Sequence, residues 1–257
     1  GFFAFNRNLP LSFRSVFHPL IGDRIKGWMG DVIDTLAVLA TLFGLATSLG
    51  LGVLQVSAGL DHVFGLPDNI YMQVGIIIAI TAVATGSVIL GIDKGVRVLS
   101  EMNIRIAALF LVFVILVGPT IFIFDSFIQN FGGYLSSVST FSFWTESYSD
   151  TDWQSSWTIF YWAWWISWSP YVGMFIARIS KGRSVKEFIL GVLIVPSIIT
   201  FLWMSAFGGS AISLEMAGIG NIGDAVNSNV ATALFVFLEQ FPLGMITSVI
   251  AIVLILS

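Results

Sequence analysis

The segment from residue 156 to residue 171 reads Ser-Trp-Thr-Ile-Phe-Tyr-Trp-Ala-Trp-Trp-Ile-Ser-Trp-Ser-Pro-Tyr. Between Trp153 and Trp168 the chain holds six tryptophans in sixteen residues, its largest departure from ordinary composition. At about 100° per residue, most of these rings fall on a helix within an arc of roughly 120°, and Trp162 points elsewhere. A continuous stripe of this kind offers π faces, which hold a cation in an apolar site without a carboxylate. The residues of this aromatic stripe are Trp157, Tyr161, Trp164, Trp165, Trp168, Tyr171 and Phe175.

The overall composition indicates an all-α integral membrane protein. The 257 residues are 56% hydrophobic and 10% charged, whereas soluble domains carry about 25% charge. Apolar stretches of about 20 residues, long enough to cross a bilayer, recur along the chain. Complete spans are predicted at residues 32–58, 69–91, 103–125, 156–178 and 187–208, and a sixth begins near residue 243. Residues 1–5 are interpreted as the end of another span, so the chain is expected to be a fragment of a larger membrane protein.

Several classes of site are absent from the sequence. There is no cysteine, which excludes disulfides and thiolate metal sites. His18 and His62 fall on opposite predicted sides of the membrane and cannot share a metal ion. Because no nucleophile–base pair, phosphate-binding loop or cluster of metal ligands is present, an enzyme is disfavoured. No catalytic residue, metal, cofactor or nucleic-acid partner is expected.

The basic residues lie only in alternate loops. They precede the first complete span, lie between the second and third, and lie between the fourth and fifth. By the positive-inside rule these loops are cytoplasmic, which predicts a multi-pass protein of the inner (plasma) membrane. The basic residues are Arg7, Arg14, Arg24 and Lys26; Lys94, Arg97 and Arg105; and Arg178, Lys181, Arg183 and Lys186.

The predicted spans contain almost no charge. The nearest charged residues are Asp31, Asp34, Glu101 and Arg105. All lie at cytoplasmic ends of spans, where a charged side chain can snorkel to the interface at a small cost in free energy. A proton relay of buried carboxylates is therefore absent from this portion of the protein, and so is a carboxylate counter-ion for a cationic solute. The aromatic stripe is left as the main means of holding positive charge.

Two long outer segments lie between the spans. In residues 126–154, apolar side chains repeat at helical spacing, which predicts an amphipathic helix along the membrane surface, with Gly132-Gly133 as a candidate bend. Residues 209–242 are rich in Gly, Ser and Asn, and we expect short helices that cover the outer mouth.

Small residues mark one face of the first complete span. Gly44, Ser48 and Gly52 share this face, with Thr41 and Thr47 nearby. Two interpretations remain open. Small residues at this spacing allow close helix packing in lipid. Alternatively, serine or threonine oxygens coordinate a small cation there.

The tryptophans differ in their predicted depth. Trp153 is assigned to the interfacial belt, and Trp162 to lipid contact or packing. Trp164, Trp165 and Trp168 lie about two to three turns inside the span, where an indole N–H needs a partner, and they are predicted to line a substrate path. Pro170 cannot donate a backbone hydrogen bond, so a kink and a free carbonyl are expected beside this path.

Residues 156–165 resemble the defining motif of the betaine/choline/carnitine transporter (BCCT) family. Residues 170–183, Pro-Tyr-Val-Gly-Met-Phe-Ile-Ala-Arg-Ile-Ser-Lys-Gly-Arg, are similar to the loop that follows it in this family. The similarity continues through residues 8–11, 47–52 and 207–209, and so covers nearly the whole chain.

The resemblance implies two inverted five-helix repeats of the sodium-symporter type. Residues 1–125 would hold the end of one span and three spans that close the first repeat. Residues 126–154 would form the extracytoplasmic surface helix and linker. Residues 155–257 would open the second repeat with the aromatic helix, residues 156–178. By the same analogy the protein is a homo-oligomer, a trimer, with the surface helix as a contact.

The resemblance also assigns roles to residues. Trp165 would contribute to an aromatic box around a trimethylammonium group, with Trp164, Trp168 and Phe160 along the path and Tyr171 and Phe175 on its inner side. Thr41 matches a position linked to Na⁺, a possible coupling ion. Leu45 stands one turn later, where sodium-coupled members can present another hydroxyl.

The sequence therefore favours a secondary active transporter that imports a small zwitterionic or cationic solute across the lipid bilayer. Glycine betaine, choline and carnitine are the expected class, held by cation–π contacts and moved by alternating access. A channel-like or structural membrane subunit, whose aromatic helix is only a packing element, is the alternative. The choice of solute, and of Na⁺ coupling, H⁺ coupling or exchange, stays open.

Overall fold

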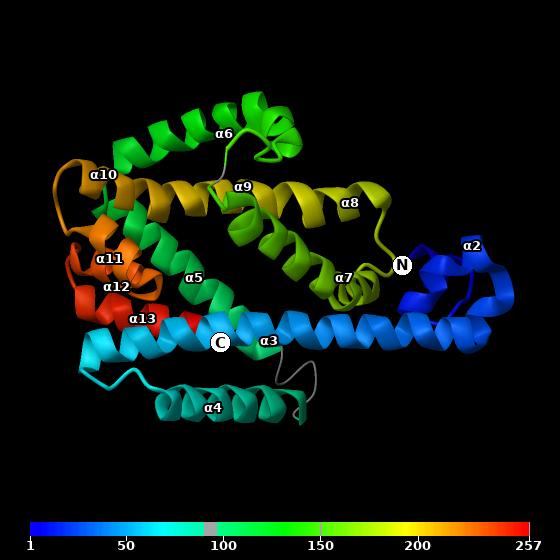
Figure 1. The fold of residues 1–257 in the computed structure, drawn as a ribbon. Coiled ribbons are helices and arrows are strands. Elements are labelled where there is room, and N and C mark those ends of the chain that lie inside the picture. The colour runs from blue at the N-terminus through cyan, green and yellow to red at the C-terminus, as the bar shows by residue number, and fades with distance from the viewer. Residues whose placement is uncertain (90–96, 150, 257) are drawn as a thin grey trace. The chain divides into compact units, whose positions relative to one another are not determined.

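The computed structural model describes residues 1–89, 97–149 and 151–256, and within these ranges every regular element is a helix (Figure 1). Lys94 and the end of the predicted second span lie outside the described residues. The longer helices are α3 (Trp28–Phe64), α4 (Ile70–Ile89), α5 (Arg97–Val117), α6 (Thr120–Phe143), α7 (Phe160–Ile179), α9 (Val195–Met204) and α13 (Gly244–Leu256). The shorter α-helices are α1 (Phe2–Asn6), α2 (His18–Ile21), α8 (Val185–Ile189), α10 (Ser210–Met216), α11 (Ile222–Ser228) and α12 (Ala233–Glu239).

Single helical turns of other types connect these elements. The 3-10 turns are η1 (Phe13–Phe17), η2 (Gly22–Lys26) and η7 (Val230–Thr232). The π turns are η4 (Gln154–Ile159), η5 (Leu190–Ile194) and η6 (Ser205–Gly209).

Four helices in the described part of the chain are long and apolar enough to cross a membrane. They are Trp28–Phe64, Ile70–Ile89, Arg97–Val117 and the continuous run Val185–Met216. The aromatic helix α7 is formed as predicted but does not belong to this set, because tryptophan, tyrosine, serine and proline lower its mean hydropathy. The first and last of the four extend beyond the predicted spans at both ends.

The ends of α3 and α4 follow from local chemistry. Gly65 has φ +66°, a left-handed conformation that ends α3 and costs glycine little free energy. Its N–H donates to the Asp61 carbonyl at 2.7 Å. The Asn69 side chain accepts hydrogen bonds from the backbone N–H groups of Tyr71 and Met72, both at 3.0 Å. An amide oxygen in this position caps the start of α4.

The prediction of a third span at residues 103–125 is wrong at its outer end. Helix α5 ends at Val117, and Gly118-Pro119 separates it from α6. Pro119 has no N–H to continue the helix. The Thr120 hydroxyl donates to the Ile115 carbonyl at 2.6 Å, which fixes the break. The predicted surface helix therefore begins at Thr120, and it passes through Gly132-Gly133 without interruption.

The described chain forms two compact units. The first comprises Gly1–Ser48 and Ser139–Pro196, and the second comprises Leu49–Val138 and Ser197–Ser257. In the first unit, α8 begins with a capping box, in which Ser184 and Glu187 exchange hydrogen bonds between side chain and backbone. This unit contains α7 and the amino-terminal half of α3, the two elements that carry the predicted site.

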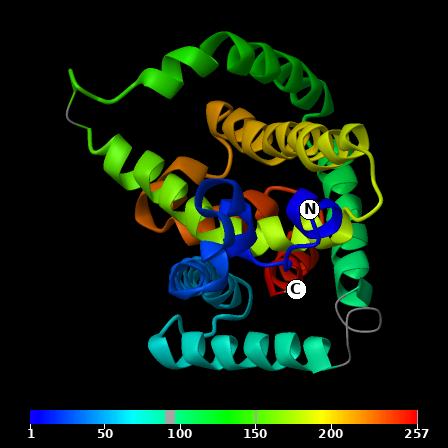
Figure 2. The same ribbon diagram turned by 90° about the vertical axis from the view of Figure 1, so that its right-hand side faces the viewer.

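The second unit holds the buried core. Phe235 on α12 is fully buried and packs against Gly59 of α3, where a Cβ atom would collide with its ring. Helix α12 is in contact with both α11 and α13 in this unit, which Figure 2 draws in orange and red. The expected short helices within residues 209–242 are confirmed by α10, α11 and α12.

Candidate functional site

A cavity lies beside the tryptophans of α7 in the first unit. Its volume is about 460 Å³. Three of the predicted path residues, Trp164, Trp165 and Trp168, line it together. The other lining residues are Ser48 of α3 and Ser169 and Val172 of α7. The structure thus brings the three deep tryptophans together around one void.

The indole N–H groups of two of these tryptophans are turned toward α3. Trp164 Nε1 donates to Ser48 Oγ at 3.0 Å. Trp168 Nε1 donates to the same oxygen at 2.9 Å and to the Gly44 carbonyl at 2.9 Å. For Trp164 and Trp168, the neighbouring helix therefore supplies the polar partner that the indole N–H was expected to need. Trp165 differs, because its side chain is 71% exposed.

Gly44 permits this close approach. A Cβ atom at Gly44 would lie 2.8 Å from Trp168 Cδ1 and 2.9 Å from Ser167 Oγ, too close for either atom. The packing interpretation of Gly44 is thus confirmed. Ser48 accepts hydrogen bonds from indole N–H groups, a role that neither the packing nor the cation-binding interpretation predicted. The Thr47 hydroxyl donates to the Phe43 carbonyl at 2.9 Å and serves its own helix.

The aromatic stripe continues on both sides of the cavity. Toward the amino end of α7, the rings of Phe160 and Tyr161 lie 6.0 and 5.8 Å from Trp164, measured between centroids. Toward the carboxyl end, Tyr171 meets Trp168 edge-on at 5.6 Å. Phe160 therefore contacts Trp164 but is not itself one of the residues that line the cavity.

Tyr171 lines a second cavity in the same unit, of about 410 Å³. Thr41 and Asp34 of α3 line it too, so the candidate ion-coupling residue and an inner aromatic residue share one space. The Thr41 hydroxyl donates to the Ala37 carbonyl at 2.8 Å, which leaves its oxygen lone pairs as acceptors. Phe175 is half exposed and lines neither cavity.

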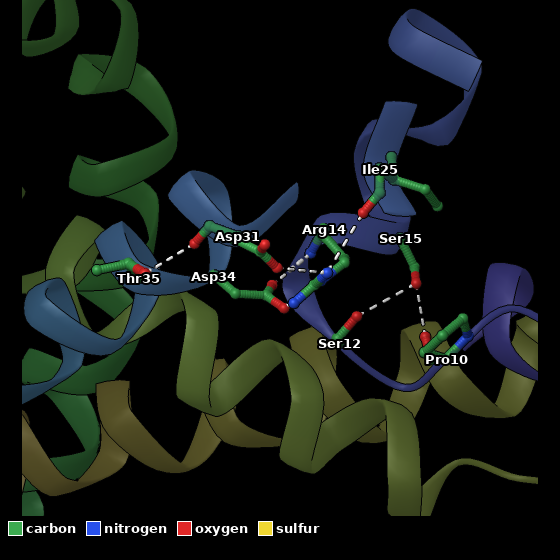
Figure 3. A network of polar contacts seen from close by, with 8 residues as sticks. All are labelled: Pro10, Ser12, Arg14, Ser15, Ile25, Asp31, Asp34 and Thr35. Carbon is green, nitrogen blue, oxygen red and sulfur yellow. Dashed lines mark hydrogen bonds and ion pairs between the residues drawn. The ribbon is translucent and has the colours of Figure 1, made fainter. Parts of the chain in front are cut away.

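An ion-pair network joins Asp34 to the segment before α3 (Figure 3). The backbone N–H of Arg14 donates to Asp34 Oδ1 at 2.9 Å, and its Nε donates to Oδ2. Arg14 Nη1 lies 3.0 Å from Asp31 Oδ1 and donates to the Ile25 carbonyl at 3.3 Å. The hydrogen bond to Asp34 is the main cause that raises the pKa of Arg14 above its ordinary value. The carboxylates at the start of α3 are thus paired rather than only snorkelling.

Pro170 lies inside α7, which is continuous on both sides of it. The Ser169 hydroxyl donates to the Ile166 carbonyl at 2.7 Å. This is the carbonyl that loses its helical partner because of Pro170. The predicted free carbonyl is therefore satisfied locally, and that part of the expectation is wrong.

The segment before α7 carries a cap that the sequence reasoning missed. The Glu146 carboxylate accepts backbone hydrogen bonds from Thr151 and Gln154, both at 2.9 Å, and from Trp153 at 3.3 Å. It also accepts the Thr151 hydroxyl, and this bond is the main cause that lowers the pKa of Glu146. A carboxylate here satisfies N–H groups at the start of the aromatic helix and complements its dipole.

Sequence signals for two of the missed features exist. Asp31 and Asp34 are three residues apart and so share a helix face, which favours pairing with one arginine. Glu146 precedes a run of polar residues that leads into a helix. No group of three or more metal-ligating side chains occurs among residues 1–89, 97–149 and 151–256.

Comparison with known proteins gives one family. The family profile described as "BCCT, betaine/carnitine/choline family transporter" matches residues 1–257. A glycine betaine/proline/choline transporter of Vibrio parahaemolyticus is 50% identical over 98% of this chain and 45% of its own length. Glycine betaine transporter 1 of the same species is 48% identical, over 100% of this chain and 49% of its own length. The glycine betaine transporter OpuD of Bacillus subtilis is 43% identical, over 99% of this chain and 50% of its own length. The chain spans about half the length of these curated relatives.

Proposed function

The chain belongs to the betaine/carnitine/choline transporter family, and we propose that it forms part of a secondary active transporter for quaternary-ammonium solutes. Its relatives in Vibrio parahaemolyticus and Bacillus subtilis are transporters by name, and those names include glycine betaine, choline and proline. Glycine betaine and choline are the first solutes to test, and carnitine the next.

One observation carries this proposal: three tryptophans line a single cavity of about 460 Å³. Two of them direct their polar N–H edges to α3, so the cavity is lined mainly by apolar ring atoms. An aromatic face near a desolvated cation contributes roughly 0.5–2 kcal/mol. Several faces around one trimethylammonium group would supply enough affinity for a carrier.

We assign the roles as follows. Trp165 forms part of the box around the cationic head, and Trp164, Trp168 and Phe160 border the path to it. Tyr171 and Phe175 lie on the inner side. The carboxylate or hydroxyl of the solute is left to backbone dipoles of other helices. Alternating access then requires one helix bundle to rock against another, exposing the site to each side in turn.

Na⁺ is the proposed coupling ion, with Thr41 as a candidate ligand. The support is that Thr41 and Tyr171 line the same cavity of about 410 Å³. Thr41→Val should then reduce the sodium dependence of uptake. Thr47→Val is the matched control, because Thr47 lies on the same helix and its hydroxyl serves only the Phe43 carbonyl among the described contacts. Equal sodium dependence in wild type and Thr41→Val would remove Thr41 from ion coupling.

The membrane placement follows the charge pattern. We propose a multi-pass protein of the inner (plasma) membrane with its basic loops in the cytoplasm. A homotrimer with α6 as a contact is proposed by family analogy.

The direct test is uptake of labelled glycine betaine, choline and carnitine into proteoliposomes that contain the full-length protein. Trp165→Leu should weaken apparent affinity about tenfold, the loss expected for one π face of a shared box. Trp162→Leu is the control, because Trp162 lies on the same helix, is 66% exposed and lies off the stripe. Unchanged affinity in Trp165→Leu would remove Trp165 from the site.

The same liposomes separate a carrier from the alternative function. A channel conducts without a coupling gradient, so current under a clamped voltage with no dependence on solute gradients would favour the channel. A structural subunit would give neither uptake nor current.

A further inference from the structure

We propose that Ser48 is a positioning residue for the solute cavity, and that its single hydroxyl fixes the orientation of both Trp164 and Trp168. This inference deepens the proposed transport function and rests on it. Ser48 lies on α3, more than one hundred residues before the two tryptophans, with sequence separations of 116 and 120.

The hydrogen-bonding capacity of this hydroxyl is fully used. A serine oxygen has two lone pairs and one proton. Its lone pairs accept the Trp164 and Trp168 N–H groups at 3.0 and 2.9 Å. Its proton is donated to the Gly44 carbonyl at 3.1 Å, one turn earlier on α3. The carbonyl therefore fixes the hydroxyl, and the hydroxyl fixes the two indoles.

The spacing on α7 explains why one oxygen reaches two rings. Trp164 and Trp168 are four residues apart, so their side chains leave the same face of the helix one turn apart. Gly44 allows the Trp168 ring to come close to α3, where a Cβ atom would lie 3.2 Å from its Nε1. Both N–H groups then converge on the residue one turn beyond Gly44.

The two indoles depend on Ser48 to different degrees. Trp168 keeps the Gly44 carbonyl as a second acceptor at 2.9 Å. For Trp164 the described residues provide Ser48 Oγ as the acceptor and no second one. Loss of the hydroxyl would therefore release Trp164 first.

This geometry determines what the cavity presents to a solute. The N–H edge of an indole is positive, and its face is negative. While Ser48 holds both N–H groups, the positive edges stay against α3 and away from a cationic head. Without the hydroxyl, an unpaired N–H would turn toward water or solute in the cavity, because an unsatisfied donor is costly. The cavity would then bind a cation less well.

The test compares three variants of the full-length protein in the uptake assay. Ser48→Ala should raise the apparent Michaelis constant for glycine betaine or choline about tenfold, while the maximal rate stays within about twofold. Thr47→Ala is the matched control, and its Michaelis constant should equal that of wild type. Ser48→Thr keeps the hydroxyl in a rotamer that serine shares, and should retain most of the affinity.

A spectroscopic measurement tests the same contact without transport. Ultraviolet resonance Raman spectra of the purified protein report the strength of indole N–H hydrogen bonds. Ser48→Ala should shift the tryptophan band toward weaker hydrogen bonding, and Ser48→Thr and Thr47→Ala should not. Wild-type affinity and an unchanged band in Ser48→Ala would overturn the inference, as would equal losses in Ser48→Ala and Thr47→Ala.

The two proposals fail in different ways. If the wild type transports no quaternary-ammonium solute but the Raman band shifts in Ser48→Ala, the proposed function fails and the positioning contact stands. If the wild type transports and Ser48→Ala leaves both the affinity and the band unchanged, only the role of Ser48 fails.

Discussion

Two groups of aromatic residues, one in each unit, are built in opposite ways. In the second unit, aromatic rings pack against one another. Trp203 and Phe207 stack with centroids 4.5 Å apart, and Phe237 meets Phe241 at 4.9 Å. Phe237 is only 2% exposed and belongs to the buried core. In the first unit, Trp164 and Trp168 of α7 contact other rings but also donate hydrogen bonds to α3, and together with Trp165 they border a cavity.

The difference shows how an aromatic residue can serve packing or recognition. A phenylalanine has no polar edge, so only contact with other apolar groups holds its ring. A tryptophan can be anchored through its N–H, which leaves ring atoms free to line a void. Anchored tryptophans around a cavity are therefore candidates for solute binding, and mutually stacked rings are candidates for the core.

The largest effect is expected where rings pack against rings. Phe237→Ala should lower the free energy of unfolding by about 3–5 kcal/mol, because it removes a buried ring and leaves a cavity. Thermal unfolding in detergent measures this loss. Phe141→Ala, at a side chain that is 72% exposed, is the control and should change stability little. A stability loss in Phe237→Ala no larger than in Phe141→Ala would contradict the description of this cluster as core.

Replacing an indole by a benzene ring, which removes the N–H together with the five-membered ring, should separate the two groups most sharply. Trp168→Phe keeps an aromatic ring but loses the bonds to Ser48 and Gly44, so solute affinity should fall about tenfold. Trp203→Phe keeps a ring that is held by stacking on Phe207, and its effect on affinity should stay within about twofold. Apparent Michaelis constants for uptake measure both. Similar losses of affinity in Trp168→Phe and Trp203→Phe would contradict the distinction between the two aromatic groups.

The ion pairs at the start of α3 should have a smaller effect. Asp34 is 26% exposed and makes two contacts with Arg14, whereas Asp31 is 68% exposed and makes one. Asp34→Asn should therefore lower the melting temperature by a few degrees, and Asp31→Asn by about one degree or less. Because Asp34 also lines the cavity with Thr41, Asp34→Asn should alter uptake more than Asp31→Asn does. An equal response of the two variants in both measurements would show that this network does not support the site.

The smallest effect concerns the cap before the aromatic helix. Hydrogen bonds from the Thr151 hydroxyl and from backbone N–H groups lower the pKa of Glu146, so the folded state favours the carboxylate. Its contribution to stability is complete above the ordinary carboxyl pKa, about 4.3, and is lost as the pH falls through the lowered value. Below about pH 4, the melting temperature of the wild type should thus fall, and that of Glu146→Gln should fall by less. Parallel melting curves from pH 7 to pH 3 would contradict the assignment of this cap.

Much of the fold follows from local patterns in the sequence. Long apolar runs predict α3, α4 and the helix at Val185–Met216, and the aromatic periodicity predicts α7. The end of α5 at Val117 was missed because apolar residues continue past Gly118-Pro119. There, the local break signal outweighs hydropathy, since Pro119 cannot donate the hydrogen bond that a continuous helix requires.

The sequence predicts that Trp164, Trp165 and Trp168 lie together, as they do around the cavity, but it does not predict their contacts. The depth of Trp164, Trp165 and Trp168 in one helix indicated a shared surface. The acceptor of their N–H groups could not be predicted, because Ser48 lies 116 residues before Trp164 and a serine face is equally consistent with packing. The same limit applies to Thr41 and Tyr171, which only the tertiary structure places in one cavity.

The most direct test of cation–π recognition is to change the charge of the solute and keep its shape. Choline and its uncharged carbon isostere, 3,3-dimethylbutan-1-ol, fill nearly the same volume, so competition against labelled uptake compares charge alone. If aromatic faces hold the cationic head, choline should bind at least about tenfold more tightly, and Trp165→Leu should narrow the gap. Equal inhibition by the two compounds would contradict cation–π recognition and leave only an apolar pocket.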